Sequence, residues 1–235
     1  MDKLNEEQLN RYYRSIRLEE IGEEGQLKLL NSSVLVVGAG GLGSIVLTYL
    51  VSSGIGHIGI IDDDSVSLDN LPRQVLYNSS DIGKKKVQVA KKKLKSLNKD
   101  VTIKIYDERL TEDNAKRVTK KYDLILDCTD NFKTKFLIND MCVALKKPFI
   151  SGGVTDYQGQ VMTYIPKKSK DFKSLFDELP KDDGIKRGVL PSAVGLIGSI
   201  QASEAIKYLV GFGDLLTDHL LVVDTLNWNI RKINF

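Results

Sequence analysis

The chain has 235 residues, of which 42% are hydrophobic and 28% are charged, and its formal net charge is +3. This composition predicts an ordinary globular protein, and the small net charge gives no argument for nucleic acid as a partner. No apolar run approaches the roughly 20 residues that cross a bilayer. The polar N-terminus also lacks the pattern of a signal peptide, so we expect a cytoplasmic protein without membrane contact.

The N-terminal segment predicts helices that precede a sheet. Asn5 can cap a first helix, with Gln8 placed to complete a capping box, and the apolar spacing continues to Ile16. Arg14 lies in this helix. A second helical segment covers residues 23–30.

A strand, a glycine turn and a helix follow in that order. Residues 34–37 are all aliphatic, as in a buried parallel strand. Glycines at 38, 40, 41 and 43 then lead into an apolar helix. Gly40 and Gly41 would let the backbone approach a ligand, and Gly43 would let the helix pack closely on its strand. This context predicts a phosphate site at the helix N-terminus, although a tight turn without ligand gives the same pattern.

A second apolar strand at residues 57–61 ends in an acidic run that begins with Asp62. Asp62 lies 24 residues after Gly38, close to the spacing of about 20 residues at which a carboxylate contacts the ribose of a nucleotide. A solvated strand-end acid is the alternative. Residues 65–74 contain turn formers and a proline, and predict a loop that crosses the carboxyl end of the sheet.

Strands and helices then alternate. The expected elements are a lysine-rich helix at 84–97, strands at 101–106, 122–127 and 148–151, and helices at 111–121 and 133–145. This alternation predicts an α/β fold with a doubly wound, mainly parallel, Rossmann-like sheet that binds ligands at the carboxyl ends of its strands.

The last third of the chain differs from this alternation. We expect a strand at 159–165, an apolar helix from Pro191 that ends at Gly211, and antiparallel strands at 219–224 and 227–235. The charged residues of 166–187 predict a mobile, exposed loop. No repeat or linker divides the chain, so we predict a single domain over residues 1–235.

Six motifs occur together in order. They are Arg11-Tyr-x-Arg14, the glycine turn, Asp62-x-Asp64, Asn70-Leu-x-Arg73-Gln74, Gly83-x-x-Lys86 and Asp127-Cys-Thr-Asp130-Asn131. With these motifs the chain resembles the HesA/MoeB/ThiF family, the bacterial relatives of ubiquitin-activating enzymes, from Arg11 to the helix that ends near Gly211.

The resemblance implies an adenylyltransferase that uses ATP and Mg²⁺. Its substrate would be a small ubiquitin-like sulfur-carrier protein that ends in Gly-Gly, in thiamine or molybdopterin-type sulfur transfer. The carrier's C-terminal carboxylate would attack the α-phosphorus of ATP and release pyrophosphate. A homodimer and a separate sulfurtransferase are the other partners that the resemblance implies.

The resemblance also assigns site residues. The implied nucleotide site consists of Gly38, Gly40, Gly41, Asp62, Asp64, Asn70, Arg73, Gln74, Lys86, Asp130 and Asn131. In this reading Asp62 contacts the ribose, while Arg73 and Lys86 neutralise the triphosphate with help from Asn70. Asp130 would hold Mg²⁺, and Arg14 would reach the ATP site of the partner subunit.

The cysteines depart from the pattern of many relatives. Residues 172–176 and the C-terminal segment lack the two C-x-x-C pairs that hold a structural zinc in those relatives, so we predict no zinc site. Cys128 and Cys142 have no apparent activating base and are expected to be buried packing residues. The acyl-adenylate is then the expected product.

Four other functions compete with this hypothesis. An NAD-dependent oxidoreductase would explain the glycine turn and Asp62 but not Arg73, Lys86 or Asp130. A tRNA threonylcarbamoyladenosine dehydratase-like enzyme would show ATP–pyrophosphate exchange that tRNA stimulates. A further alternative is an enzyme that adenylates a ribosomal peptide, as other relatives do. A binding module without turnover would not need the phosphate and metal residues.

Overall fold

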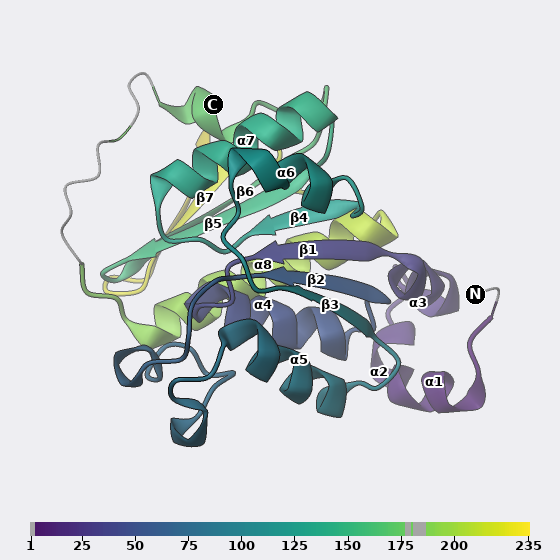
Figure 1. Ribbon diagram of the computed structural model, residues 1–235. Coiled ribbons are helices and arrows are strands. Elements are labelled where there is room, and N and C mark those ends of the chain that lie inside the picture. Colours follow the sequence, from purple (N-terminus) through teal and green to yellow (C-terminus); the bar gives the residue numbers. More distant parts are fainter. Residues whose placement is uncertain (1–2, 177–179, 181–186) are drawn as a thin grey trace.

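The structure is a computed structural model that describes residues 3–176, 180 and 187–235. In this part of the chain, eight strands form one sheet in the order β3-β2-β1-β4-β5-β6-β7-β8 (Figure 1). The strands are β1 (Ser33–Val37), β2 (His57–Ile61), β3 (Thr102–Tyr106), β4 (Leu124–Asp127), β5 (Phe149–Thr155), β6 (Gln158–Tyr164), β7 (His219–Asp224) and β8 (Asn229–Asn234). From β3 to β5 the neighbours are parallel, and from β5 to β8 they are antiparallel. The predicted fold class is confirmed.

Helices cover both faces of the parallel part of the sheet. The helices are α1 (Glu6–Arg11), α2 (Tyr13–Ile16), α3 (Gly22–Asn31), α4 (Gly41–Ser52), α5 (Lys86–Leu97), α6 (Glu112–Thr119), α7 (Phe132–Leu145) and α8 (Pro191–Val210), with 3₁₀ turns η1 (Leu68–Asn70), η2 (Ser79–Asp81) and η3 (Phe172–Leu175). α4, α5 and α8 pack on one face, and α6 and α7 pack on the other (Figure 1). Within β1, Val34 and Val36 join the first core while Leu35 and Val37 join the second, because successive strand side chains point to opposite faces.

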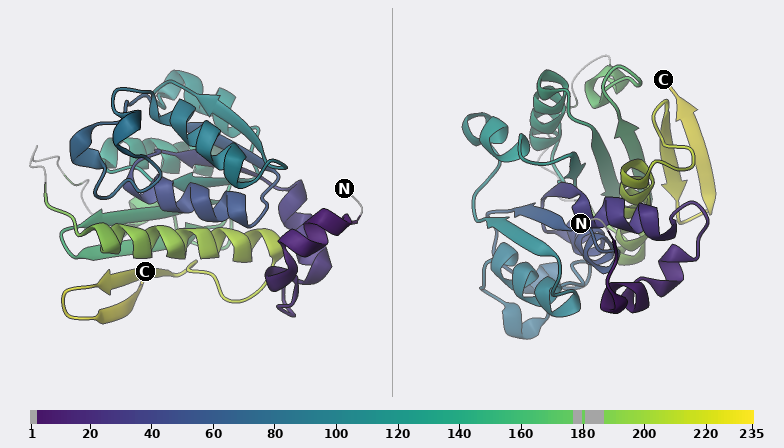
Figure 2. Two further views of the ribbon diagram at one scale, coloured as in Figure 1. Left: turned by 90° about the horizontal axis from the view of Figure 1, so that it is seen from below. Right: turned by 90° about the vertical axis from the view of Figure 1, so that its right-hand side faces the viewer.

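The N-terminal helices lie at one end of the molecule (Figure 2). The predicted capping box of Asn5 and Gln8 is confirmed. The single helix expected up to Ile16 is instead α1 and α2, separated at Tyr12. The Tyr12 side chain is buried, and its hydroxyl accepts a hydrogen bond of 2.9 Å from Asn98 Nδ2. The helix is interrupted at the residue whose ring is buried and bonded to Asn98.

The loop expected at residues 166–187 is partly ordered and partly buried. η3 lies within it, and Phe172 is 2% exposed. The backbone N–H of Phe172 donates to Asn139 Oδ1 of α7 at 2.8 Å, so a buried amide ties the segment to the helix. The expectation of an exposed loop is therefore wrong for this part. Residues 177–179 and 181–186, on which the rest of the expectation falls, lie outside the described residues.

β7 and β8 form a hairpin at one edge of the sheet (Figure 2). The predicted antiparallel pairing is confirmed. Its turn and outer strand expose apolar side chains: Leu226 is 61% exposed, Trp228 75% and Ile230 64%. Monomeric proteins rarely expose contiguous apolar surface of this kind without a partner.

Candidate functional site

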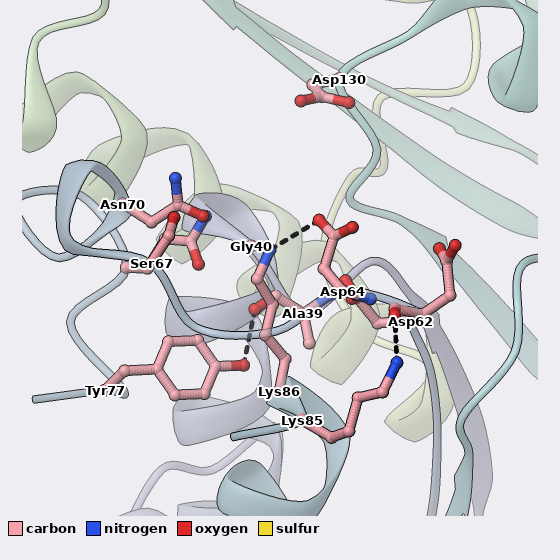
Figure 3. Close-up of polar contacts among 12 residues, drawn as sticks. Ala39, Gly40, Asp62, Asp64, Ser67, Asn70, Tyr77, Lys85, Lys86 and Asp130 are labelled. Carbon is pink, nitrogen blue, oxygen red and sulfur yellow. Dashed lines mark hydrogen bonds and ion pairs between the residues drawn. The ribbon is translucent and has the colours of Figure 1, made fainter. Parts of the chain in front are cut away.

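The ends of three neighbouring strands bring the predicted site residues to one edge of the sheet. β1, β2 and β4 are parallel, so the segments that follow them leave the same edge. These segments carry the glycine turn, the acidic run and the Asp130 turn. Figure 3 shows part of the group: Gly40, Asp62, Asp64, Asn70, Lys86 and Asp130.

The glycine turn joins β1 directly to α4. Gly38 has a φ of +92°, in the left-handed region that favours glycine. A Cβ on Gly43 would lie 2.1 Å from the carbonyl oxygen of Gly38, so the helix could not pack this closely with any other residue. Gly40 is the N-cap residue and α4 begins at Gly41. The first N–H groups of α4 have no acceptors within the helix and carry its positive end, which suits an anion.

Asp62 holds the glycine turn in place. Its Oδ2 accepts from the backbone N–H of Ala39 at 2.7 Å, and its Oδ1 accepts from the N–H of Asp64 at 2.8 Å. Burial raises the pKa of Asp62, while the Lys86 cation and the two N–H donors act in the opposite direction. The structure thus gives Asp62 a role in shaping the turn, and the ribose contact stays a prediction.

Lys86 is a buried cation at this edge. Its side chain is 4% exposed, and Nζ lies 2.9 Å from Oδ2 of Asp64, whose own side chain is 60% exposed (Figure 3). The backbone N–H of Lys86 also donates to the Asp64 carbonyl at 3.0 Å. A cation that is shielded from bulk water interacts more strongly with a nearby anion than a solvated one does.

The loop between β2 and α5 lies over the glycine turn. A Cβ on Gly41 would be 3.7 Å from Arg73 Cγ, and one on Gly40 would be 3.5 Å from Gln74 Nε2. Gln74 Nε2 donates to Asn70 Oδ1 at 3.0 Å, and Arg73 Nη1 donates to the Asp69 carbonyl at 3.0 Å. The structure therefore brings the predicted loop residues to the start of α4.

Asp130 and Asn131 lie where β4 passes into α7. Asn131 is the N-cap of α7, and its Oδ1 accepts from the Thr134 N–H at 2.9 Å. The cap of α7 is therefore Asn131 and not Asp130. Asp130 is instead exposed, and its Oδ1 lies 3.5 Å from the Asn131 amide. Its carboxylate is thus available for a ligand.

A buried ion pair fixes the turn that carries Asp130. Lys135 Nζ donates to Asp127 Oδ2 at 3.0 Å and to the Gly152 carbonyl at 2.6 Å. The other Asp127 oxygen, Oδ1, accepts from the Thr129 hydroxyl at 2.7 Å and from its N–H at 3.1 Å. One carboxylate therefore connects the end of β4, the following turn, α7 and β5.

Replacing Lys135 with methionine is expected to lower the free energy of unfolding by about 3–5 kcal/mol, because Asp127 would stay buried without its cation. Urea denaturation would measure the loss. The double variant Lys135→Met with Asp127→Asn should recover part of it, since no buried charge then lacks a partner. A double variant no more stable than Lys135→Met would contradict this reading of the pair.

Arg14 is separated from the site of its own chain. It is exposed on α2, and the N-terminal helices contact residues that precede β2 and β3. Gly56 N–H donates to the Leu29 carbonyl at 3.0 Å, and Asn98 bonds Tyr12. Arg14 therefore lies near the amino ends of the strands, at the edge opposite the site.

Comparison with known proteins decides the family. The model of the ThiF family matches residues 12–235, nearly the whole chain. The chain belongs to the ThiF family. The resemblance to HesA/MoeB/ThiF proteins is confirmed.

Curated relatives share two-fifths of the sequence. The chain is 43% identical over 235 residues to the "Adenylyltransferase and sulfurtransferase MOCS3" of Culex quinquefasciatus, covering 98% of this chain and 54% of the relative. It is 41% identical over 239 residues to the "Sulfur carrier protein adenylyltransferase" of Thermus thermophilus, covering 97% and 87%. The chain spans about half the length of its MOCS3 relatives.

Solved structures share the fold of this ThiF-family chain. Escherichia coli MccB, crystallised with MccA-N7isoASN, superposes with a TM-score of 0.87 at 24% identity, covering 96% of this chain and 72% of MccB. PaaA superposes with a TM-score of 0.86 at 23% identity, covering 100% and 75%.

Both cysteines of the chain are buried, as expected. Burial raises the pKa of the Cys128 thiol and of the Cys142 thiol, which leaves both in the unreactive protonated form. Within the described ranges, no helix combines the length and the apolar character needed to cross a bilayer.

Sequence reasoning missed two polar residues that support the site of this ThiF-family chain. Lys135 lies in the helix expected at 133–145, where the sequence singled out no buried cation, and its side chain is 7% exposed. Tyr77 is 5% exposed, and its hydroxyl donates to the Ala39 carbonyl at 2.7 Å. The available signal for Tyr77 was that it is the one aromatic residue in the sequence of residues 62–85.

Proposed function

We propose that the chain adenylates the C-terminal glycine carboxylate of a small ubiquitin-like sulfur-carrier protein, with ATP as the second substrate. The observation that carries the proposal is the buried Lys86 cation beside the glycine turn, with Arg73 at the same helix end and Asp130 on the neighbouring strand end. The curated relatives described above are named as adenylyltransferases, one of them for sulfur-carrier proteins.

The proposed reaction joins two anions. The carboxylate oxygen forms a bond to the α-phosphorus of ATP, the bond from that phosphorus to the β-phosphate oxygen breaks, and pyrophosphate leaves with the electron pair. Charge neutralisation and alignment are the main needs of such a transfer. Arg73 and Lys86 supply the positive charge, Asn70 and the first N–H groups of α4 orient the phosphates, and Asp62 contacts the ribose.

Asp130 fits a magnesium ion. Mg²⁺ binds through one or two carboxylates together with substrate phosphates and water, so one exposed carboxylate beside a triphosphate site is sufficient. When bound, Mg²⁺ would neutralise phosphate charge. We propose Asp130 as its protein ligand and keep the prediction that the chain holds no structural zinc.

The carrier is proposed to bind along the later strands. β5 continues four residues beyond its last pairing with β4, through Gly152 and Gly153, toward the site edge. An extended C-terminal tail could lie along this strand, while the exposed apolar side chains of the β7–β8 hairpin contact the body of the carrier. Because both cysteines are buried, we propose that a separate sulfurtransferase supplies the sulfur.

ATP–pyrophosphate exchange tests the proposed function. Purified protein is assayed with candidate carriers that end in Gly-Gly, with the same carriers lacking the last glycine, with tRNA and with a ribosomal peptide. We expect exchange only with an intact Gly-Gly carrier. Exchange stimulated by tRNA or by the peptide, and by none of the carriers, would overturn the proposal in favour of those substrates.

We also propose a homodimer in which Arg14 of each subunit completes the site of the other. The support is the position of Arg14 at the sheet edge opposite its own site. An exposed apolar surface on α4, α5 and the preceding loop, with Tyr49, Val75 and Leu97 at 50%, 62% and 42% exposure, is the proposed subunit contact.

Complementation tests this arrangement. Arg14→Ala and Lys86→Met should each be inactive alone, whereas an equal mixture after subunit exchange should regain about one quarter of wild-type activity, because half of the dimers then hold one intact site. Activity should not return when two Lys86→Met preparations are mixed. A mixture that stays as inactive as its parents would contradict the shared site.

A further inference from the structure

The Tyr77 hydroxyl makes a buried contact with the glycine turn that the reaction chemistry does not itself require. It donates to the Ala39 carbonyl at 2.7 Å, and Ala39 is fully buried (Figure 3). Burial raises the pKa of Tyr77, and the nearby Asp62 and Asp81 carboxylates raise it further, so the phenol stays a protonated donor.

Both backbone polar groups of Ala39, its N–H and its carbonyl, are therefore held by hydrogen bonds. Its N–H donates to Asp62 Oδ2 at 2.7 Å, and its carbonyl accepts from Tyr77. The carbonyl of Ala39 and the N–H of Gly40 belong to one peptide unit, which is planar and trans. In a trans peptide unit the C=O and N–H bonds point in opposite directions. A hydrogen bond that fixes the Ala39 carbonyl therefore also fixes the direction of the Gly40 N–H, at the N-cap of α4.

Tyr77 also belongs to the loop that carries Arg73 and Gln74. Its backbone N–H donates to the Gln74 carbonyl at 3.0 Å. The hydroxyl consequently ties this loop to the glycine turn at the point where Gln74 approaches Gly40. This hydrogen bond joins the loop that carries Arg73 to the helix end that the loop faces.

We propose that Tyr77 is a positioning residue for the triphosphate: without touching the nucleotide, its hydroxyl orients the Gly40 N–H and holds the Arg73 loop against it. This inference rests on the proposed function for its ligand, ATP. Loss of the hydroxyl would leave the Ala39 carbonyl without its donor and free the peptide to rotate, while the phenyl ring keeps its packing.

The test is Tyr77→Phe, with Tyr122→Phe as the matched control. Tyr122 is also 5% exposed, and its hydroxyl lies 3.1 Å from that of Tyr106 on the face of the sheet covered by α6 and α7. In ATP–pyrophosphate exchange, Tyr77→Phe should raise the KM for ATP about five- to tenfold and change kcat less than about twofold, as expected for one lost buried hydrogen bond that acts on binding. Tyr122→Phe should leave the KM unchanged.

Two outcomes separate this inference from the proposed function. If the wild-type protein binds no ATP, the proposed function fails. Amide hydrogen exchange without nucleotide then tests separately whether Tyr77 holds the glycine turn. In the protein without nucleotide, the amides of residues 38–43 should exchange faster in Tyr77→Phe than in wild type and Tyr122→Phe. Unchanged exchange in this segment, or an unchanged KM in a protein that does bind ATP, would overturn the role given to Tyr77.

Discussion

Replacing Asp130 with asparagine is expected to lower the rate of carrier-stimulated ATP–pyrophosphate exchange by about 10²–10³-fold, the size of effect seen when one electrostatic contact to a reacting group is removed. The side chain keeps its shape but loses the charge that we propose holds Mg²⁺. Because Asp130 is exposed and Asn131 provides the cap of α7, the variant should fold like the wild type.

Asp113→Asn is the matched control for Asp130→Asn. Asp113 is an exposed acid near the start of α6, outside the site, and its variant should keep wild-type exchange. Raising the Mg²⁺ concentration should restore part of the activity of Asp130→Asn, because weaker metal binding is the proposed defect. Full exchange by Asp130→Asn at low Mg²⁺ concentration would refute the metal assignment.

Lys86→Met is expected to lower kcat/KM for ATP by about 10²–10³-fold, because it removes a water-shielded cation from the phosphate site. Thermal unfolding should change little. The partner Asp64 is 60% exposed, so water can solvate its carboxylate when the cation is gone. This differs from Lys135, whose loss leaves Asp127 buried.

The adjacent residue supplies the control for Lys86→Met. Lys85 is 45% exposed, pairs with Asp107 at 3.2 Å and donates to the Asp63 carbonyl at 2.7 Å. Lys85→Met removes the same charge from the same helix start, and should change kcat/KM less than about threefold, as expected for a screened surface cation. Equal losses in the two variants would mean that net charge matters and that the position of Lys86 does not.

The local elements of the fold could be predicted because their signals lie within short stretches of sequence. The strand at 57–61, the helix that ends at Gly211 and the capping box of Asn5 all appear as expected. The break at Tyr12 could not be predicted, since it depends on Asn98, 86 residues away. The ordered turn η3 likewise depends on the buried amide of Asn139 in another helix.

The candidate site shows the same division. Residues at strand ends, such as Asp62 and Asp130, could be placed at one edge because parallel strands present their carboxyl ends together. The supporting contacts were not visible in the sequence. Tyr77 meets Ala39 across 38 residues, and Lys135 is buried only because β5 lies beside the end of β4.

Isothermal titration of the purified protein with ATP, with and without Mg²⁺, tests most directly whether this edge of the sheet is a nucleotide site. We predict one ATP per subunit, tighter binding with Mg²⁺, and a clear loss of affinity in Lys86→Met but not in Lys85→Met. If the protein binds no ATP, or if its affinity for ATP changes neither with Mg²⁺ nor in Lys86→Met, this edge of the sheet is not the proposed nucleotide site.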